Sequence, residues 1–205
     1  MNKYGLTKDI VFELILKFFK NDFKITSLAE NARSCYYYCR KKGLTHTSFS
    51  MLGSMGQELS MGLGVSLALR KHESRKTVVI TSDGSLLSNT NSFFTIGIMK
   101  PSSLIVICLD NEKHLATGGQ ETASKYVDLQ KIAAICNFDS YRVENKTKLI
   151  QVFKQIGNKN RPIFIQVKVN DKKAKSENIR EMPVIIFQNF SSYIQNKKND
   201  KNQKI

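Results

Sequence analysis

Two short polar segments of this sequence each follow a run of apolar residues and carry side chains that could bind a metal ion. The first is TSDGS at 81–85, directly after TVVI, and the second ends in Asn111, directly after LIVICL. The carboxylate of Asp83 and the amide oxygen of Asn111 suit a hard cation such as Mg²⁺, which commonly completes its shell with water and phosphate oxygens. Gly84 permits close backbone approach, and the Ser85 hydroxyl could bind phosphate. The pattern predicts a site for a Mg²⁺-bound diphosphate, although either segment alone could be an ordinary turn.

The elements that must position these residues are strands and helices in alternation, which predicts an α/β fold with a parallel sheet and helices on both faces. In such a sheet, ligands bind beyond the carboxyl ends of the strands. The 28 positions from Asp83 to Asn111 allow one crossover, so we expect the two residues side by side at that edge. We expect strands at 25–26, 77–81, 104–109, 141–143 and 163–169, and helices at 8–20, 29–42, 57–70, 89–99, 127–136, 147–156 and 184–194.

The remaining segments are predicted to be irregular. We expect a polar connector at 43–50, a turn at 82–85 and a long polar loop at 110–125. The whole of 1–194 is predicted to be one domain, since a chain of 205 residues can bury about 70% of its surface. The basic tail at 195–205 has no apolar period, and we expect it to be disordered.

Composition excludes several classes of protein. The net charge is +15, but the basic residues are spread along the chain, which favours a solvated basic surface over a nucleic-acid site. No apolar run reaches the roughly 18 residues of a membrane span, and no signal peptide is expected. The four cysteines do not form a disulfide framework, and Cys35 and Cys39 with only His46 nearby make an incomplete zinc site. A reduced, cytoplasmic protein is the expectation.

The Asp-Gly-Ser segment with an Asn about 25 residues later resembles the thiamin-diphosphate-binding motif of thiamin-dependent enzymes. The resemblance implies a thiamin-diphosphate-binding fold, specifically the domain that holds the diphosphate. It also implies that Asp83, Gly84, Ser85 and Asn111 bind the cofactor. The Mg²⁺ ligands would be Asp83, Asn111 and the backbone carbonyl of Lys113, whose side chain must point away from the metal.

A second segment, Gly53-Ser54-Met55-Gly56 before a helix of small residues, is similar to the Gly-Ser-apolar-Gly segment of the same domain. The resemblance implies that Gly53, Ser54 and Met55 bind the cofactor. Met55 would wedge between its two rings, and the Gly53 carbonyl would meet the aminopyrimidine. Simple core packing is the alternative for Met55.

A third segment, LDNEKHLATGGQ at 109–120, is similar to a loop of phosphonopyruvate decarboxylases and of the β subunits of sulfopyruvate decarboxylases. This resemblance implies decarboxylation of a small anionic 2-oxo acid to an aldehyde. His114 is then a candidate catalytic residue for proton transfer, or a ligand of the substrate's anionic tail. Gly118 and Gly119 could present N–H groups to a phosphonate or sulfonate. A plain loop histidine and a flexible hinge are the alternatives.

The resemblance also implies a missing part, because the glutamate that activates the cofactor comes from a separate pyrimidine-binding domain in these enzymes. Glu58 is interpreted as a surface or cap residue on the wrong side of the cofactor. We therefore expect a β-type subunit of a hetero-oligomer, active only with a partner chain. A transketolase-type half, a 2-oxoacid:ferredoxin oxidoreductase subunit and a non-catalytic α/β binding domain remain open.

Overall fold

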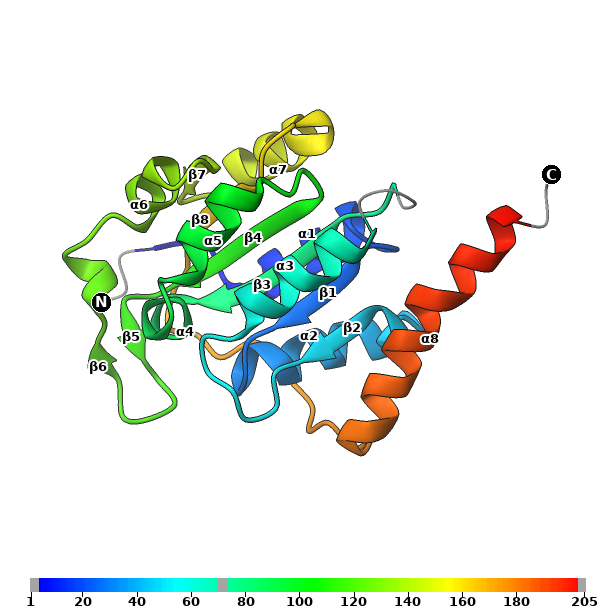
Figure 1. Cartoon of the computed structure of the whole chain (residues 1–205). Helices are drawn as coiled ribbons and strands as arrows, with labels where there is room; N and C mark the ends of the chain where they lie inside the picture. The colour runs from blue at the N-terminus through cyan, green and yellow to red at the C-terminus, as the bar shows by residue number, and fades with distance from the viewer. Residues whose placement is uncertain (1–3, 70–73, 203–205) are drawn as a thin grey trace.

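A six-stranded sheet in which every neighbouring pair is parallel forms the centre of the computed structural model, which describes residues 4–69 and 74–202 (Figure 1). Its strands are β1 (Phe23–Thr26), β2 (Ser48–Ser50), β3 (Thr77–Ser82), β4 (Leu104–Asp110), β7 (Asp139–Val143) and β8 (Ile163–Lys168). Their order is β2-β1-β3-β4-β8-β7. Two further strands, β5 (Lys113–His114) and β6 (Gln120–Glu121), form a separate antiparallel hairpin.

Helices cover both faces of the sheet, as the sequence predicts. The helices are α1 (Lys8–Phe18), α2 (Glu30–Arg40), α3 (Glu58–Leu69), α4 (Asp83–Ser88), α5 (Ser92–Met99), α6 (Leu129–Ile135), α7 (Lys146–Gln155) and α8 (Pro183–Asn202). Apolar side chains of α1, α2 and α7 share one cluster, and those of α3, α5, α6 and α8 share the other. The predicted α/β fold class is therefore confirmed.

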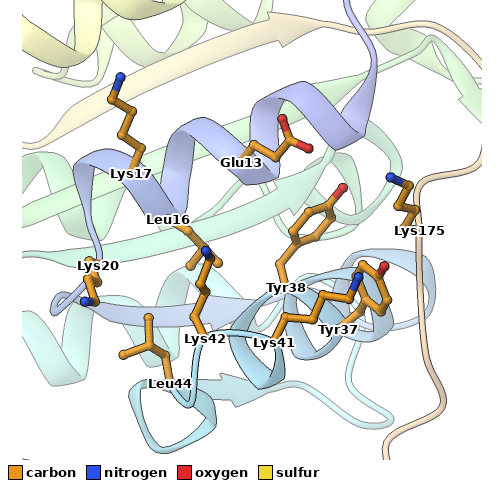
Figure 2. A pocket seen from close by; sticks show the side chains of 10 residues that line it. All are labelled: Glu13, Leu16, Lys17, Lys20, Tyr37, Tyr38, Lys41, Lys42, Leu44 and Lys175. Carbon is orange, nitrogen blue, oxygen red and sulfur yellow. The ribbon is translucent and has the colours of Figure 1, made fainter.

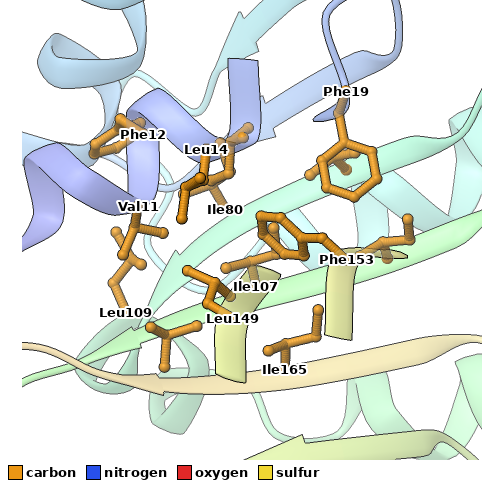
Figure 3. Packing of buried hydrophobic residues seen from close by; sticks show 14 of the residues in the cluster. Val11, Phe12, Leu14, Phe19, Ile80, Ile107, Leu109, Leu149, Phe153 and Ile165 are labelled. Atoms are coloured by element: carbon orange, nitrogen blue, oxygen red, sulfur yellow. The ribbon is translucent and has the colours of Figure 1, made fainter. Parts of the chain in front are cut away.

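The central strands are continuous apolar runs because both of their faces are buried. Side chains alternate between the faces, so Ile80 and Ile107 belong to the cluster under α1, whereas Val79 and Val106 belong to the opposite one. Figure 3 shows the first cluster, where residues of α1 and α7 converge on β3, β4 and β8. Packing on both faces prevents each strand from shifting along its axis, and this fixes the positions of the strand ends.

Four local predictions differ from the structure. The connector at 43–50 contains β2, a short edge strand that pairs with β1. The expected turn at 82–85 lies instead at the start of α4, and the loop at 110–125 contains the β5–β6 hairpin. At the C-terminus α8 continues to Asn202, so the described part of the tail is helical where disorder was predicted. Its Lys and Gln residues are fair helix formers even without an apolar face.

None of the helices in the described ranges is long and apolar enough to cross a membrane. The four cysteines are all buried and unpaired as disulfides. Within the same ranges, no group of three or more His, Cys, Asp or Glu residues is arranged to hold a metal ion.

Candidate thiamin diphosphate site

The carboxyl ends of β3 and β4 meet at one edge of the sheet. The two strands pair in parallel with Ser82 opposite Leu109, so Asp83 and Asn111 follow directly at neighbouring strand ends. This register confirms the predicted juxtaposition of the two segments. One crossover through α4 and α5 connects the strands, as the 28-residue spacing requires.

Asp83 is a fully buried carboxylate with one satisfied oxygen and one unsatisfied oxygen. Its Oδ2 accepts hydrogen bonds from the hydroxyls of Thr122 and Ser124. Its Oδ1 is buried and has no hydrogen-bond partner among the described residues. Burial, together with the nearby charge of Asp110, raises the pKa of Asp83 to about 6. A buried, unpartnered carboxylate oxygen is costly in isolation, and a bound cation would compensate it.

The donor set fits Mg²⁺. Asn111 is almost fully buried at the end of the strand next to that of Asp83, and among the described residues its Oδ1 accepts one long hydrogen bond, of 3.4 Å, from the backbone N–H of Lys113. The Lys113 ammonium points to Asp171, with an Nζ–Oδ2 distance of 2.7 Å. The expectation that this ammonium points away from a bound metal remains a prediction. The coordination itself remains a prediction.

The Asp-Gly-Ser segment forms the first turn of α4. Ser82 is its N-cap, and the Ser82 hydroxyl accepts a hydrogen bond of 3.2 Å from the backbone N–H of Ser85. Gly84 packs against the imidazole of His114: a Cβ at position 84 would lie 2.5 Å from the ring's Nδ1. Any larger residue at position 84 would therefore displace this side chain, which comes from the β5–β6 hairpin.

The predicted Gly-Ser-Met-Gly segment is tied to α4 through its last residue. Gly56 has a φ of +78°, and its N–H donates a hydrogen bond of 2.9 Å to the Ser85 hydroxyl. Met55 is 41% exposed, so the core-packing alternative for this residue is wrong. Gly53 and Ser54 are also exposed, and the contacts with a cofactor proposed for them remain predictions.

A pocket of about 180 Å³ lies at this edge of the sheet. Its lining comes from the starts of α1 and α2, the loop before α3, the first turn of α4, the end of β4 and the β5–β6 hairpin. The residues are Lys8, Ser27 to Asn31, Met55, Ser82, Gly84, Ser85, Leu109, Asn111 and Lys113 to Thr117. The structure thus brings together the predicted residues Met55, Gly84, Ser85, Asn111 and His114. Asp83 is fully buried and is not among the lining residues.

The two hairpin glycines do not line this pocket. Gly118 and Gly119 have φ values of +128° and +83°, which only glycine adopts easily, and they form the tip between β5 and β6. The N–H of Gly119 already donates a hydrogen bond of 2.9 Å to the His114 carbonyl. The expectation that this N–H is presented to a substrate anion is therefore wrong for the conformation described. The contact proposed for Gly118 remains a prediction.

Sequence reasoning missed a buried charge network behind the site. The Lys168 ammonium lies 2.8 Å from Asp110 and 2.8 Å from Glu112. Burial favours the neutral amine, but hydrogen bonds to these two carboxylates outweigh it and raise the pKa of Lys168. Gln166 and Ser124 also donate to the Asp110 carboxylate. The available signal was a lysine and a glutamine inside the apolar strand β8.

Glu58 is neither a surface residue nor a solvated cap. Its side chain is fully buried at the start of α3 and accepts a hydrogen bond from the Thr81 hydroxyl. Its second oxygen, Oε2, is buried without a partner among the described residues. Glu58 is not among the residues that line the pocket.

Comparison with known proteins identifies the class. The family model described as "Thiamine pyrophosphate enzyme, C-terminal TPP binding domain" matches residues 30–167. The chain therefore belongs to the thiamine pyrophosphate enzymes, and it is the domain that binds the cofactor. The fold agrees: benzoylformate decarboxylase from Polynucleobacter necessarius superposes with a TM-score of 0.68 at 16% identity, over 84% of this chain and 34% of that one.

Two relatives are more specific. Sulfopyruvate decarboxylase subunit beta from Methanocaldococcus jannaschii is 30% identical over 187 residues, which cover 91% of this chain and 95% of that protein. Sulfopyruvate decarboxylase from Methanosarcina acetivorans is 35% identical over 181 residues, covering 87% of this chain but 44% of the relative. The predicted class, a subunit of a thiamin-diphosphate-dependent decarboxylase, is confirmed by these relatives.

Proposed function

We propose that this chain is the diphosphate-binding subunit of a decarboxylase that acts on a small anionic 2-oxo acid such as sulfopyruvate or phosphonopyruvate. The observation that carries the proposal is the buried, unpartnered Oδ1 of Asp83, which follows β3 where Asn111 follows the neighbouring strand β4; Asn111 and Met55 line the pocket at this edge. An α/β domain that used this edge only for packing would gain nothing from an unsatisfied carboxylate there.

In this proposal, Asp83, Asn111 and the Lys113 carbonyl hold Mg²⁺. The Ser85 hydroxyl and the backbone at Gly84 hold the cofactor's diphosphate. Bound thiamin diphosphate would supply an electron sink for the loss of carbon dioxide. These chain residues bind and orient it, and they perform no covalent step.

His114 is the proposed proton-transfer residue of this subunit. Its ring lies close to Gly84 and lines the pocket, which supports a role in proton transfer to a substrate bound there. Lys8 also lines the pocket but is paired with Glu30 at 2.8 Å, so it adds little attraction for an anionic substrate.

We further propose that a partner chain supplies the activating glutamate, in a reducing, cytoplasmic setting. Glu58 is the local alternative, but it is buried against Thr81 and outside the pocket. The relatives support a divided enzyme: one bears the name "subunit beta" and matches this chain over nearly its whole length. The other matches over less than half of its own length, which leaves room for a second domain in that protein.

The test is co-expression with a candidate partner that carries a glutamate at a strand end. The pure chain and the pair are each given thiamin diphosphate, Mg²⁺ and one of sulfopyruvate, phosphonopyruvate or pyruvate, and carbon dioxide and aldehyde are quantified. We expect turnover only from the pair, rising with partner concentration. Robust turnover by the pure chain that Glu58→Gln abolishes would refute the divided site.

A further inference from the structure

A second and larger pocket lies between the C-terminal halves of α1 and α2, away from the diphosphate site. Its volume is about 580 Å³, within the range of small-molecule sites. Figure 2 shows its lining, which comes from α1, from α2 and the residues after it, and from the segment that follows β8. The residues are Glu13, Leu16, Lys17, Lys20, Tyr37, Tyr38, Lys41, Lys42, Leu44 and Lys175.

The charge around this pocket is strongly unbalanced. Five lysines line it against a single carboxylate, Glu13. Within the described ranges, none of the five ammonium groups forms an ion pair, although that of Lys41 lies 4.6 Å from the centre of the Tyr37 ring. Cations gathered at one concave surface focus an attractive field for anions. An anionic ligand would neutralise them.

Helix polarity explains only part of this lysine cluster. A cation at the C-terminal end of a helix is favoured by the helix dipole, which accounts for Lys17 in the last turn of α1 and Lys41 at the C-cap of α2. Lys20 and Lys42 lie beyond the helix ends, and Lys175 comes from a segment more than 130 residues away in sequence. The convergence of these three on one pocket is therefore not a property of either helix.

The floor of the pocket is apolar and aromatic. Tyr38 is buried, and its hydroxyl donates a hydrogen bond of 2.6 Å to Asp9, which fixes the ring. Tyr37 stands edge-on to it with ring centroids 5.2 Å apart, and Leu16 and Leu44 complete the apolar part. A flat apolar group could lie against these side chains while charged groups reach the lysines.

We propose that this pocket binds a small ligand that combines a flat ring with two or three phosphates, the chemistry of a nucleoside diphosphate or triphosphate. The proposal is independent of the decarboxylase assignment. Lys8 of α1 lines the diphosphate pocket, whereas Lys17 lines this one; nine residues of helix separate them by about 13 Å. Both pockets could therefore be occupied at once.

The experiment is calorimetric titration of the full chain with ADP, ATP and inorganic tripolyphosphate, in EDTA so that no Mg²⁺-dependent site contributes. We expect ATP to bind more tightly than ADP, and tripolyphosphate more weakly than ATP because it has no ring. Lys42→Gln/Lys175→Gln should weaken ATP binding about tenfold or more, since it removes two of the five positive charges that would pair with the phosphates.

Matched variants separate a built site from general charge. Lys131→Gln/Lys148→Gln removes the same charge from exposed positions of α6 and α7, and we expect ATP affinity to change less than about twofold. Tyr37→Ala should weaken ATP binding but leave tripolyphosphate binding unchanged, with thermal melts used to confirm folding. Three results would overturn the proposal: no heat with millimolar ATP, equal weakening by the control pair, or a hexaglutamate peptide binding as tightly as ATP.

Discussion

Asp83→Asn should stabilise the metal-free chain, although it removes the charge on which the proposed site depends. The carboxylate is fully buried, its Oδ1 has no partner in the described residues, and the Asp110 carboxylate is close enough to raise its pKa. The amide is nearly isosteric, and its oxygen can still accept the hydrogen bonds from Thr122 and Ser124. The substitution therefore removes mainly the cost of a buried charge.

The size of the effect follows from the pKa of Asp83. A rise from 3.8 to about 6 corresponds to about 3 kcal/mol of lost stability once the carboxyl is ionised. The new amide N–H groups need an acceptor, which reduces the gain, so we expect an increase of about 1–3 kcal/mol at pH 8. For a chain of this size that is roughly 3–10 °C in Tm.

The sign of the pH dependence provides a second check. Because the folded-state pKa of Asp83 is raised, protonation favours the folded state, and this stability is fully present below about pH 4. It is lost as the pH rises through about 6. The Tm difference between Asp83→Asn and the unmodified chain should therefore be small near pH 4 and grow up to pH 7. Thermal melts in EDTA measure it, and an unchanged or lower Tm at pH 8 would refute the reasoning.

Three other substitutions test separate parts of the site. Gly84→Ala should displace the His114 imidazole, and we expect kcat of the assembled enzyme to fall about tenfold or more with little change in Tm. An unchanged kcat would show that His114 has no part in the mechanism. Lys168→Met leaves Asp110 buried and uncompensated, so urea denaturation should show a loss of about 3–5 kcal/mol, partly recovered by adding Asp110→Asn. Met55→Ala should change stability by less than about 0.5 kcal/mol because the side chain is exposed, yet lower turnover; a large Tm loss with normal kcat contradicts its role.

The parts of the fold that could be predicted are the elements that are determined by the residues of their own segment. The strands β3 and β4 are uninterrupted β-branched and apolar runs, and only a strand buried on both faces favours that composition. The strand-end positions of Asp83 and Asn111 followed from the crossover alone. The edge strand β2 could not be found in this way, since Ser48-Phe49-Ser50 has too few residues for a period and is held by pairing with β1.

The parts of the site that could not be predicted depend on contacts between distant segments. Thr122 and Ser124 bond to Asp83 across about 40 positions of sequence, and Lys168 reaches Asp110 across 58. Nothing in the loop at 110–125 predicts that it folds back over α4 as a hairpin. Burial of Glu58 was missed because a polar residue at a helix start is usually solvated, whereas here Thr81 accommodates it from the next strand.

The two aspartates at the sheet edge are similar in burial but opposite in environment, and this difference supports the metal assignment. Asp110 receives an ammonium from Lys168 and hydrogen bonds from Gln166 and Ser124, so its charge is compensated within the chain. Among the described residues, the side-chain donors to Asp83 are two hydroxyls, both on Oδ2, and no ammonium group pairs with it. If the edge were purely structural, both carboxylates would need equal compensation, because an uncompensated buried charge costs several kcal/mol. Because Asp110 is compensated and Asp83 is not, Asp83 keeps a negative charge at the strand ends, which a divalent cation with a diphosphate would compensate.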